Sequence, residues 1–426
     1  MSITRKTFLR SLGVGAVGLL ATRGQGANIA PSPALPPFLE KDPESFWRAV
    51  RAGYPIEDDP LYLNTGGLGP ASNRVLLAVE TTARQLQRHS ETGHELLDPA
   101  RAVVAKFLGA QSDEICFTRN ATEANSIISA GLVLKPGDEV IFESHAHPGG
   151  SFPWLNQVKQ RGITVRLFDP EPTSPEANLK RIRDLIGPRT KVIQVSHITC
   201  TTGVRMPVRE IAAVAREHGL WFHIDGAQSV GMIPVNLSGI GCDSYAISGH
   251  KWLGGPHETG VLFLRRDKLE MVAPTGIGAH SGELTFLPGA LVYRAAAARH
   301  EYGTRSAASI VALAEAIRLQ EEIGRERIAD HGHSLATSVI AACEGLRGIQ
   351  LLTPRDPQMR GSMVTFHHEH ANAAKFFEYL RKKHGLRCRP VTEQGLEAVR
   401  ISFHVFNSTA DAARVSKALH AAGTEL

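Results

Sequence analysis

The sequence predicts an α/β fold in which a mostly parallel sheet lies between helices, followed by a smaller C-terminal α+β domain. Two observations predict it. From about residue 46 to residue 290, short apolar strands alternate with helical patterns, as in a sheet that helices cover on both faces. After about residue 300 this alternation ends, and long helical stretches surround two strands.

The strands of the large sheet are predicted from short apolar runs. The clearest are residues 139–142 (EVIF), 192–196 (VIQVS) and 221–225 (WFHID). A helix is expected between the last two, because Pro207 suits a first helical turn, apolar residues recur on one face, and Gly219 ends the pattern.

The C-terminal domain is predicted from four segments. Strands are expected at residues 363–366 and 399–403, and helices at 372–384 and 410–422. The second helix follows Asn-Ser-Thr at 407–409, whose side chains suit a helix N-cap. Together these segments predict a small α+β unit.

Composition and charge exclude several classes of protein. The chain has 426 residues, of which 42% are hydrophobic and 21% charged, as in globular proteins of two or three domains. Four basic residues precede residue 27, where no acidic residue occurs, so the formal charge of +5 falls to +1 for the remainder. They are Arg5, Lys6, Arg10 and Arg23. Without a basic stripe interleaved with aromatic residues, we expect no nucleic-acid partner.

The first 26 residues read as an export signal. They have a basic start, an apolar stretch and small residues suited to cleavage. Residues 4–10 (TRKTFLR) resemble a twin-arginine signal with Lys6 in place of the second arginine. This predicts a periplasmic or secreted protein, the alternative being a short leader on a cytoplasmic one. No other stretch is apolar enough for a membrane span, so no stable membrane anchor is expected.

These patterns divide the chain into four parts. We expect the export signal at 1–26, a proline-rich N-terminal arm at 27–58, a large domain at 59–295 and a small domain at 296–426. The five cysteines are widely spaced and contain no C-x-x-C pair. Neither a disulfide framework nor a zinc site is therefore predicted.

Two residues stand out as chemical. Lys251 lies in SGHKWLGG, a run of small and apolar residues, although lysines usually belong to the surface. Desolvation in such a place favours the neutral, nucleophilic amine. Asp225, in HIDGAQS, ends a strand that looks buried. An aspartate at a strand end is weak evidence alone, but the pair is stronger together.

Four motifs in order carry a family resemblance. They are HIDGAQS at 223–229, SGHKW at 248–252, EYGTR at 301–305 and VRISFHVFN at 399–407. They resemble the class V aminotransferases of pyridoxal-phosphate fold type I, and look closest to the isopenicillin N epimerase-like branch. The resemblance covers most of the chain after residue 60. It implies a seven-stranded sheet, pyridoxal 5'-phosphate as the cofactor, and a homodimer.

The resemblance assigns roles around the cofactor ring. Lys251 would bind the cofactor covalently and later move protons at the substrate Cα. Asp225 would keep the pyridine nitrogen protonated, and Gln228 would hydrogen-bond the phenolic oxygen. His147 would stack on the ring, with His145 as the fallback. A metal pair at these two histidines is the alternative, but no carboxylate or cysteine at ligand spacing supports it, and no metal is predicted.

A phosphate site is expected where a strand ends and residues 120–122 (NAT) open a helix. The backbone amide of Ala121 and the hydroxyl of Thr122 could hold an anion there. The family usually has G-T-T-E at this place, and this chain has N-A-T-E. By resemblance, Ser248 and His250 would complete the phosphate site.

Two further residues are assigned by resemblance. Thr304 would reach the phosphate of the other subunit, although a turn residue after Gly303 is the alternative. Arg400 would bind the substrate's α-carboxylate as a bidentate pair. The alternative for Arg400 is a surface arginine on a strand. The histidine-rich run at 367–370 (HHEH) is expected to be a solvated turn rather than a metal site.

The reaction is expected to be transamination or epimerisation at the Cα of an amino acid or an amino-acid-bearing metabolite. A cysteine desulfurase-like C–S or C–N lyase is the alternative. It is disfavoured because Cys388, followed by Arg389, falls on an expected strand rather than a loop. Cys200 replaces a common asparagine of the family, with a role that stays open. A non-catalytic binding protein is the contrasting hypothesis, against which Lys251, Asp225 and Arg400 argue.

Overall fold

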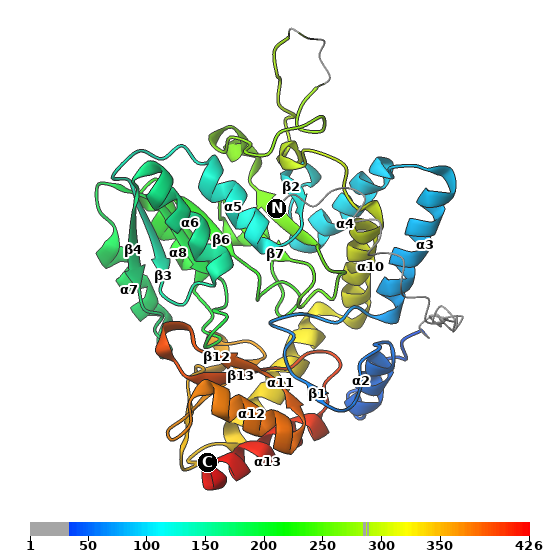
Figure 1. The fold of residues 1–426 in the computed structure, drawn as a ribbon, viewed down its shortest axis with the longest axis vertical. Coiled ribbons are helices and arrows are strands. Elements are labelled where there is room, and N and C mark those ends of the chain that lie inside the picture. The colour runs from blue at the N-terminus through cyan, green and yellow to red at the C-terminus, as the bar shows by residue number, and fades with distance from the viewer. Residues whose placement is uncertain (1–33, 284–286, 288) are drawn as a thin grey trace, which may run out of the picture. The chain divides into compact units, whose positions relative to one another are not determined.

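The computed structural model describes residues 34–283, 287 and 289–426. The expected export signal at 1–26 lies outside the described residues. A large α/β part is followed along the chain by a smaller part built on a second sheet (Figure 1). None of the described helices is long and apolar enough to cross a membrane.

The large sheet has seven strands in the order β2-β8-β7-β6-β5-β3-β4. The strands are β2 (Ile115–Thr118), β3 (Glu139–Glu143), β4 (Thr164–Phe168), β5 (Thr190–Ser196), β6 (Trp221–Asp225), β7 (Ser244–Ser248) and β8 (Gly260–Leu264). All neighbouring pairs from β7 to β4 are parallel, whereas β8 runs antiparallel to both of its neighbours. The predicted mostly parallel sheet between helices is confirmed.

Helices cover both faces of this sheet (Figure 1). They are α3 (Asn73–His89), α4 (Leu97–Leu108), α5 (Ala121–Gly131), α6 (Pro148–Arg161), α7 (Pro175–Leu185), α8 (Val208–Glu217), α9 (Leu237–Ile240) and α10 (Ala307–Ile323), preceded along the chain by α2 (Pro43–Ala52). Two begin as their sequence suggests, since the Asn120 side chain caps α5 and the Ser174 side chain caps α7.

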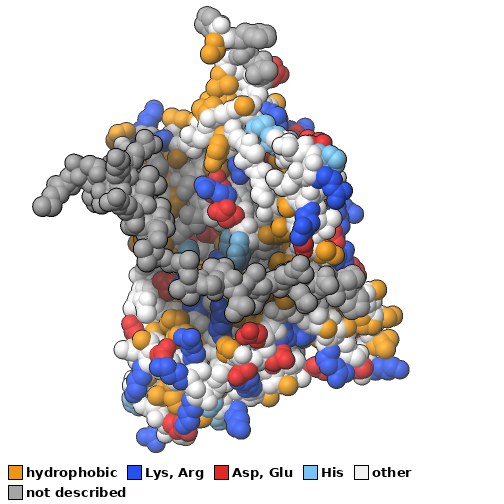
Figure 2. Space-filling view, turned by 45° about the vertical axis from the view of Figure 1, so that its right-hand side comes forward, with side chains coloured by type: hydrophobic (Ala, Val, Ile, Leu, Met, Phe, Trp, Pro, Cys, Tyr) orange, Lys and Arg blue, Asp and Glu red, His pale blue; other side chains and the backbone are white. Residues whose placement is uncertain are grey.

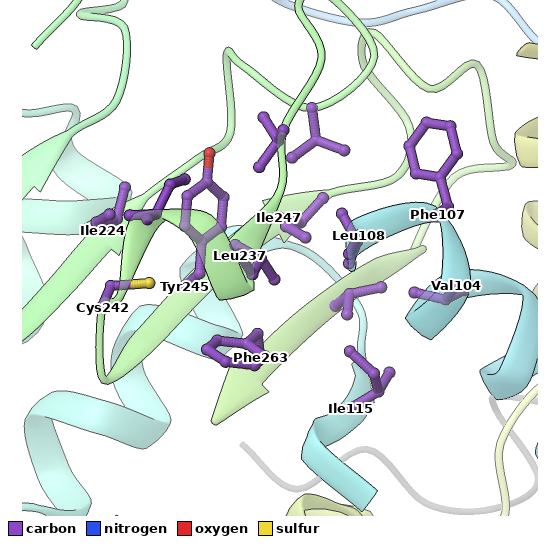
Figure 3. Close-up of a cluster of buried hydrophobic side chains, with 14 of the residues drawn as sticks. Val104, Phe107, Leu108, Ile115, Ile224, Leu237, Cys242, Tyr245, Ile247 and Phe263 are labelled. Atoms are coloured by element: carbon purple, nitrogen blue, oxygen red, sulfur yellow. The ribbon is translucent and has the colours of Figure 1, made fainter. Parts of the chain in front are cut away.

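Alternation along the strands divides the core between the two faces. Val140 and Phe142 pack in one apolar cluster with α5 and α6, whereas Ile141 between them packs in the other. This is the period of two expected for a β-strand. In the second cluster, Tyr245 and Phe263 from the sheet lie with side chains of α4 (Figure 3). Both faces are therefore buried, which accounts for the nearly continuous apolar runs in the sequence.

The small domain is built on an antiparallel sheet in the order β12-β13-β10-β9. Its strands are β9 (Ile349–Leu351), β10 (Met363–His368), β12 (Arg389–Val391) and β13 (Ala398–Ser402). Its helices are α11 (Arg325–Ala342), α12 (Ala373–His384) and α13 (Thr409–Glu425). Strand β9 was not predicted, because three residues carry too little alternation to be recognised. The strand expected around Cys388 is divided in the structure into β11 (Leu386–Arg387) and β12, with Cys388 between them.

A short pairing joins the beginning of the described chain to the small domain. Strand β1 (Leu61–Tyr62) runs parallel to β11 (Leu386–Arg387). The pairing continues past β1, where the Ser402 amide donates to the Leu63 carbonyl at 2.8 Å. Residues after β1 therefore pass beside β13, the strand that carries Arg400.

The strand ends define where a ligand can bind. Asp225 is the last residue of β6 and Ser248 the last of β7, and these parallel strands end at one edge of the sheet. Ligands of open α/β sheets bind at the carboxyl ends of the strands. Strands β12 and β13 lie on the side of the small domain that faces the large one (Figure 1).

Candidate active site

A cavity of about 250 Å³ collects the residues that the sequence singles out. All of the expected site residues except Thr304 line it. They are Ala121, Thr122, His147, Asp225, Gln228, Ser248, His250, Lys251 and Arg400. They come from the carboxyl ends of β6 and β7, the start of α5, the start of α6, and β13.

Asp225 is held by hydrogen bonds on both carboxylate oxygens. Its Oδ1 accepts from the Ala227 amide at 3.0 Å, and its Oδ2 accepts from Asn125 Nδ2 at 3.0 Å. Asn125 Nδ2 also donates to the Gly149 carbonyl, so its Oδ1 is oriented away from the carboxylate. The carboxylate therefore has one defined orientation at the end of β6.

Behind Asn125 lies a buried histidine. His223 Nε2 is 2.8 Å from Asn125 Oδ1, and His223 Nδ1 is 2.7 Å from Ser244 Oγ. Because Asn125 Oδ1 can only accept, Nε2 carries the proton and Nδ1 accepts from the serine hydroxyl. Burial lowers the pKa of His223 to about 4, so the ring is neutral at pH 7. No role was predicted for His223, although it begins the HIDGAQS motif, or for Asn125, which lies one helical turn after Ala121 on α5.

Lys251 lies in the turn after β7, where it is half-buried and borders the cavity. Burial lowers the pKa of its ammonium group. The Asp225 carboxylate opposes that shift, whereas the Arg400 and Arg389 cations add to it. The neutral amine that a covalent bond to a carbonyl group requires is thus favoured at Lys251.

The start of α5 and the end of β7 form a site rich in donors. The Ala121 amide donates to Ser248 Oγ at 3.3 Å, and the buried His250 Nδ1 has no hydrogen-bond partner. A Cβ atom on Gly149 would overlap the Thr122 hydroxyl, so only glycine leaves room there. Helix N-termini with free donors bind phosphate groups.

The residues present fit pyridoxal phosphate. Asp225 would hold the ring nitrogen, the donors at Thr122, Ser248 and His250 would hold the phosphate, and Lys251 would attach the aldehyde carbon. The unpartnered nitrogen of His250 is the observation that supports the fit, because buried polar atoms without partners are uncommon unless a ligand completes them.

The two candidate ring-stacking histidines differ in position. His147 lines the cavity, and its Nδ1 accepts from the Gly149 amide at 3.0 Å. Burial lowers the pKa of His147, and the nearby Lys251 adds to that shift. His145 does not line the cavity, although its Nδ1 is buried without a partner. The geometry therefore favours His147 over His145 as the histidine beside the cofactor.

Arg400 is a buried cation whose hydrogen bonds go to neutral acceptors. Its side chain is 1% exposed, Nη1 donates to the Cys200 carbonyl at 2.6 Å, and Nη2 donates to Asn64 Oδ1 at 3.0 Å. Its Nε has no partner. Burial lowers the pKa of Arg400 to about 10, and the Arg389 cation adds to the shift. None of the acceptors of its hydrogen bonds is charged, as expected of an arginine that binds a substrate carboxylate.

Gln228 and Gly66 show how closely the segment after β1 approaches this cavity. Gln228 Nε2 donates to the Gly66 carbonyl at 2.8 Å, and Gln228 Oε1 accepts from Trp252 Nε1 at 2.9 Å. A Cβ atom on Gly66 would lie 2.8 Å from Arg400 Nη2. Asn64 and Gly66 were not predicted, because their partners are more than 150 residues away in the sequence.

Only one of the five cysteines lines the cavity. All five are described and buried, and Cys388 packs in the apolar core of the small domain. Cys200 borders the cavity, and burial raises the pKa of its thiol above the ordinary value. A thiol in this state is protonated at neutral pH and is a poor nucleophile.

The remaining expected residues lie outside the cavity. Thr304 is exposed and does not line it. In the run at 367–370, His368 Nε2 is 3.1 Å from the Ala422 carbonyl, and the chain turns after it. Within the described residues, no group of three or more His, Cys, Asp or Glu side chains could hold a metal ion.

Comparison with protein families gives a match over most of the chain. The family described as Aminotransferase class-V matches residues 75–415. The probable cysteine desulfurase 2 of Mycobacterium leprae is 30% identical over 344 residues, which are 75% of this chain and 80% of that protein. The probable cysteine desulfurase of Vibrio cholerae is 30% identical over 397 residues, 88% of this chain and 98% of that protein.

Solved structures give the same fold. The apo cysteine desulfurase of Thermococcus onnurineus superposes with a TM-score of 0.80 at 25% identity, covering 89% of this chain and 98% of that one. The cystine C–S lyase C-DES, in complex with its reaction product cysteine persulfide, gives a TM-score of 0.79 at 24% identity, with 85% and 97% covered. The latter likeness shows the fold alone.

These relatives correct one expectation. The predicted aminotransferase or epimerase function is wrong, because the relatives are cysteine desulfurases and favour the C–S lyase alternative. The physical reason is that Lys251, Asp225 and the phosphate site fix the cofactor but not which bond of the substrate breaks. Pyridoxal phosphate as the cofactor and fold type I are both confirmed.

Proposed function

Because this chain belongs to the class V aminotransferase family, we propose that it is a pyridoxal-phosphate-dependent lyase that breaks the Cβ–S bond of a sulfur-bearing amino acid. The cysteine desulfurase relatives support the bond and the class of substrate. The residues that line the cavity are the observation that supports elimination over transfer of sulfur to an enzyme thiol. Lys251, Asp225 and Arg400 converge there, while Cys200 is the only thiol beside them and is buried and protonated.

Different residues of the cavity act on different groups of the substrate. When bound, pyridoxal phosphate supplies an electron sink for the bonds at the substrate Cα. Arg400 binds the α-carboxylate, for which it has an unpartnered Nε and no acidic neighbour among its hydrogen-bond partners. Once the substrate amine has displaced it, the Lys251 amine takes the Cα proton, because its lowered pKa favours the neutral base.

The elimination balances without an oxidant or a reductant. As the proton leaves Cα, the Cβ–S bond breaks and its electron pair departs with the sulfur. The products are a thiol and 2-aminoacrylate, which water converts to pyruvate and ammonium. The neutral His223 and Asn125 keep the Asp225 carboxylate in place throughout.

The test measures which carbon product forms. Purified protein loaded with pyridoxal phosphate is incubated with cystine and with cysteine, and pyruvate, ammonium and alanine are quantified. Elimination gives pyruvate and ammonium in equal amounts, whereas sulfur transfer to an enzyme thiol gives alanine. Alanine without pyruvate would overturn the proposal. A Cys200→Ser variant serves as the control, because it abolishes only the transfer route.

A homodimer is part of this proposal. Large apolar side chains are exposed along the segment before Thr304, and apolar side chains also gather on the projecting part of the molecule in Figure 2. They are Ile277, Leu291, Val292 and Tyr302. Exposed apolar patches mark association surfaces. A second copy bound here would bring Thr304 to its phosphate site. Sedimentation analysis of the loaded protein tests this, and a monomer at micromolar concentration would contradict it.

Export is the last part of the proposal and rests on residues 1–26 alone. Cell fractionation of the full chain and of a chain without these residues tests it. Full-length protein that stays in the cytoplasm would contradict it. Lysine, arginine, aspartate and glutamate side chains are interspersed on the face shown in Figure 2, which supports a small-molecule substrate over a nucleic acid.

A further inference from the structure

Two arginines lie side by side in the wall of the cavity. Arg389 on β12 is directly opposite Arg400 on β13 in the antiparallel register, and both line the cavity. Side chains of directly opposed residues project from the same face with Cβ atoms about 5 Å apart. Like charges in this position destabilise a strand pair. The described protein groups do not fully balance these two positive charges. The pair therefore favours a ligand that brings negatively charged groups into the cavity.

The two guanidinium groups are engaged differently. Arg400 is 1% exposed and donates only to neutral oxygens. The Arg389 side chain is 26% exposed and forms an ion pair with Glu393 through Nη2. The other terminal nitrogen of Arg389, Nη1, is buried and has no hydrogen-bond partner. The Nη2 atom of Arg389 is thus held by Glu393, whereas its Nη1 atom is free to bind a ligand.

Glu393 holds Arg389 from a constrained turn. The Glu393 carboxylate also accepts from the Thr392 amide at 3.1 Å, and the next residue, Gln394, has a left-handed φ of 55°. Glu393 therefore has little freedom to follow a ligand into the cavity. This arrangement orients Arg389 without occupying Nη1.

We propose that Arg389 is a specificity-determining residue that binds a second carboxylate of the substrate, while Arg400 binds the α-carboxylate. The substrate class is then a dicarboxylic sulfur amino acid, of which cystine is the simplest disulfide. The inference rests on the proposed lyase function and narrows its substrate. A planar guanidinium with a free edge suits a carboxylate. The greater exposure of Arg389 assigns it to the end of the substrate farther from Lys251.

The shape of a disulfide agrees with two adjacent cations. The C–S–S–C dihedral angle is about 90°, so cystine is bent at the disulfide rather than fully extended. Both carboxylates can then lie on one side of the molecule. Elimination would leave both sulfur atoms on the departing half as cysteine persulfide, together with pyruvate and ammonium, and no redox partner is needed.

The test uses two mixed disulfides of cysteine that differ only in the second anion. One carries 3-mercaptopropionate and the other propanethiol, so a carboxylate replaces a methyl group. The loaded wild-type protein is expected to show a KM about 10- to 100-fold lower for the carboxylate conjugate, as for one charge-assisted pair. Arg389→Gln is expected to reduce this preference to within about threefold. Arg389→Lys is expected to restore part of it.

Arg387→Gln is the matched control, because Arg387 is exposed two residues earlier and does not line the cavity. It should keep the wild-type preference, and visible absorbance of the bound cofactor should show that each variant is loaded. An equal rise in KM for both conjugates in Arg389→Gln would overturn the proposal, because Arg389 would then act on the α-carboxylate.

A separate binding measurement keeps the two proposals distinguishable. If wild-type protein releases pyruvate from neither conjugate, the lyase function fails. Calorimetry then decides on Arg389 with glutarate and butyrate as probes. Tighter binding of glutarate that Arg389→Gln abolishes supports a second carboxylate site. Equal binding of the two acids to wild-type protein overturns it.

Discussion

Asn125 Nδ2 donates a 3.0 Å hydrogen bond to Asp225 Oδ2, and this contact joins α5 to the end of β6. The same helix begins at the phosphate site, so one element fixes both the carboxylate and the donors that flank it. A substitution at Asn125 is therefore expected to affect the binding of both the cofactor ring and its phosphate group.

Asn125→Ala is expected to weaken cofactor binding and stability together. It leaves His223 Nε2 and Asp225 Oδ2 without their partner, and each unsatisfied buried group costs about 1–3 kcal/mol. Cofactor titration and thermal unfolding measure the two effects. Ser126→Ala, on the same helix but outside the cavity, should change neither. Unchanged cofactor affinity in Asn125→Ala would contradict this role.

Lys251→Ala is expected to abolish covalent attachment of the cofactor while the fold stays intact. The turn around Lys251 is held by backbone contacts, such as the Gly254 amide to the Lys251 carbonyl at 3.0 Å, which alanine retains. Borohydride reduction followed by mass spectrometry detects the attachment, and circular dichroism reports the fold. A reduced adduct in the variant would mean that another lysine holds the cofactor.

Arg400→Gln is expected to raise KM for any α-amino acid substrate by about 100-fold or more, because the α-carboxylate of the substrate loses its buried cationic partner. Removing the charge also relieves the cost of burying it. The free protein should therefore unfold at a similar or higher temperature than wild type. Steady-state kinetics and thermal unfolding separate the two effects, and a lowered kcat at unchanged KM would contradict a binding role.

His223 predicts a loss of stability in acid. Its pKa falls from an ordinary value of 6.5 to about 4 in the folded protein, because burial disfavours the charged ring. As the pH drops below 6.5, the unfolded chain takes up this proton and the folded protein does not. The contribution, on the order of 3 kcal/mol, is therefore present above pH 6.5 and lost by about pH 4.

Urea unfolding at several pH values measures this loss. His223→Gln retains an amide donor toward Asn125 but cannot titrate, so its stability should decline less steeply between pH 6.5 and 4. Parallel pH curves for the variant and the wild type would contradict the assignment.

The sequence could predict residues whose chemistry shows in contiguous motifs at strand ends. Lys251, Asp225 and Ser248 belong to this group, because parallel strands bring their carboxyl ends to one edge of a sheet. The alternation of core residues between the two faces of the sheet could also be predicted from the sequence, because apolar runs such as 139–142 are typical of β-strands.

The rest depends on contacts between distant segments. Asn64 and Asn125 are ordinary polar residues until the fold places them against Arg400 and Asp225. Arg389 could not be recognised from the sequence as a residue of the cavity, because the register of two short strands places it opposite Arg400. The reaction was predicted wrongly for a related reason. The position of Cys388 disfavours one route to C–S cleavage, in which an enzyme thiol takes up the sulfur, but it does not bear on elimination.

The pairing of β1 with β11 has a consequence for the timing of synthesis. Residues 61–66 are synthesised well before their partners at 386–387 and 400–402. The wall of the cavity that contains Arg400 and Gly66 cannot close before residue 402 has been translated. A nascent chain arrested before residue 386 should therefore fail to retain pyridoxal phosphate, whereas a chain that includes these partners should acquire it.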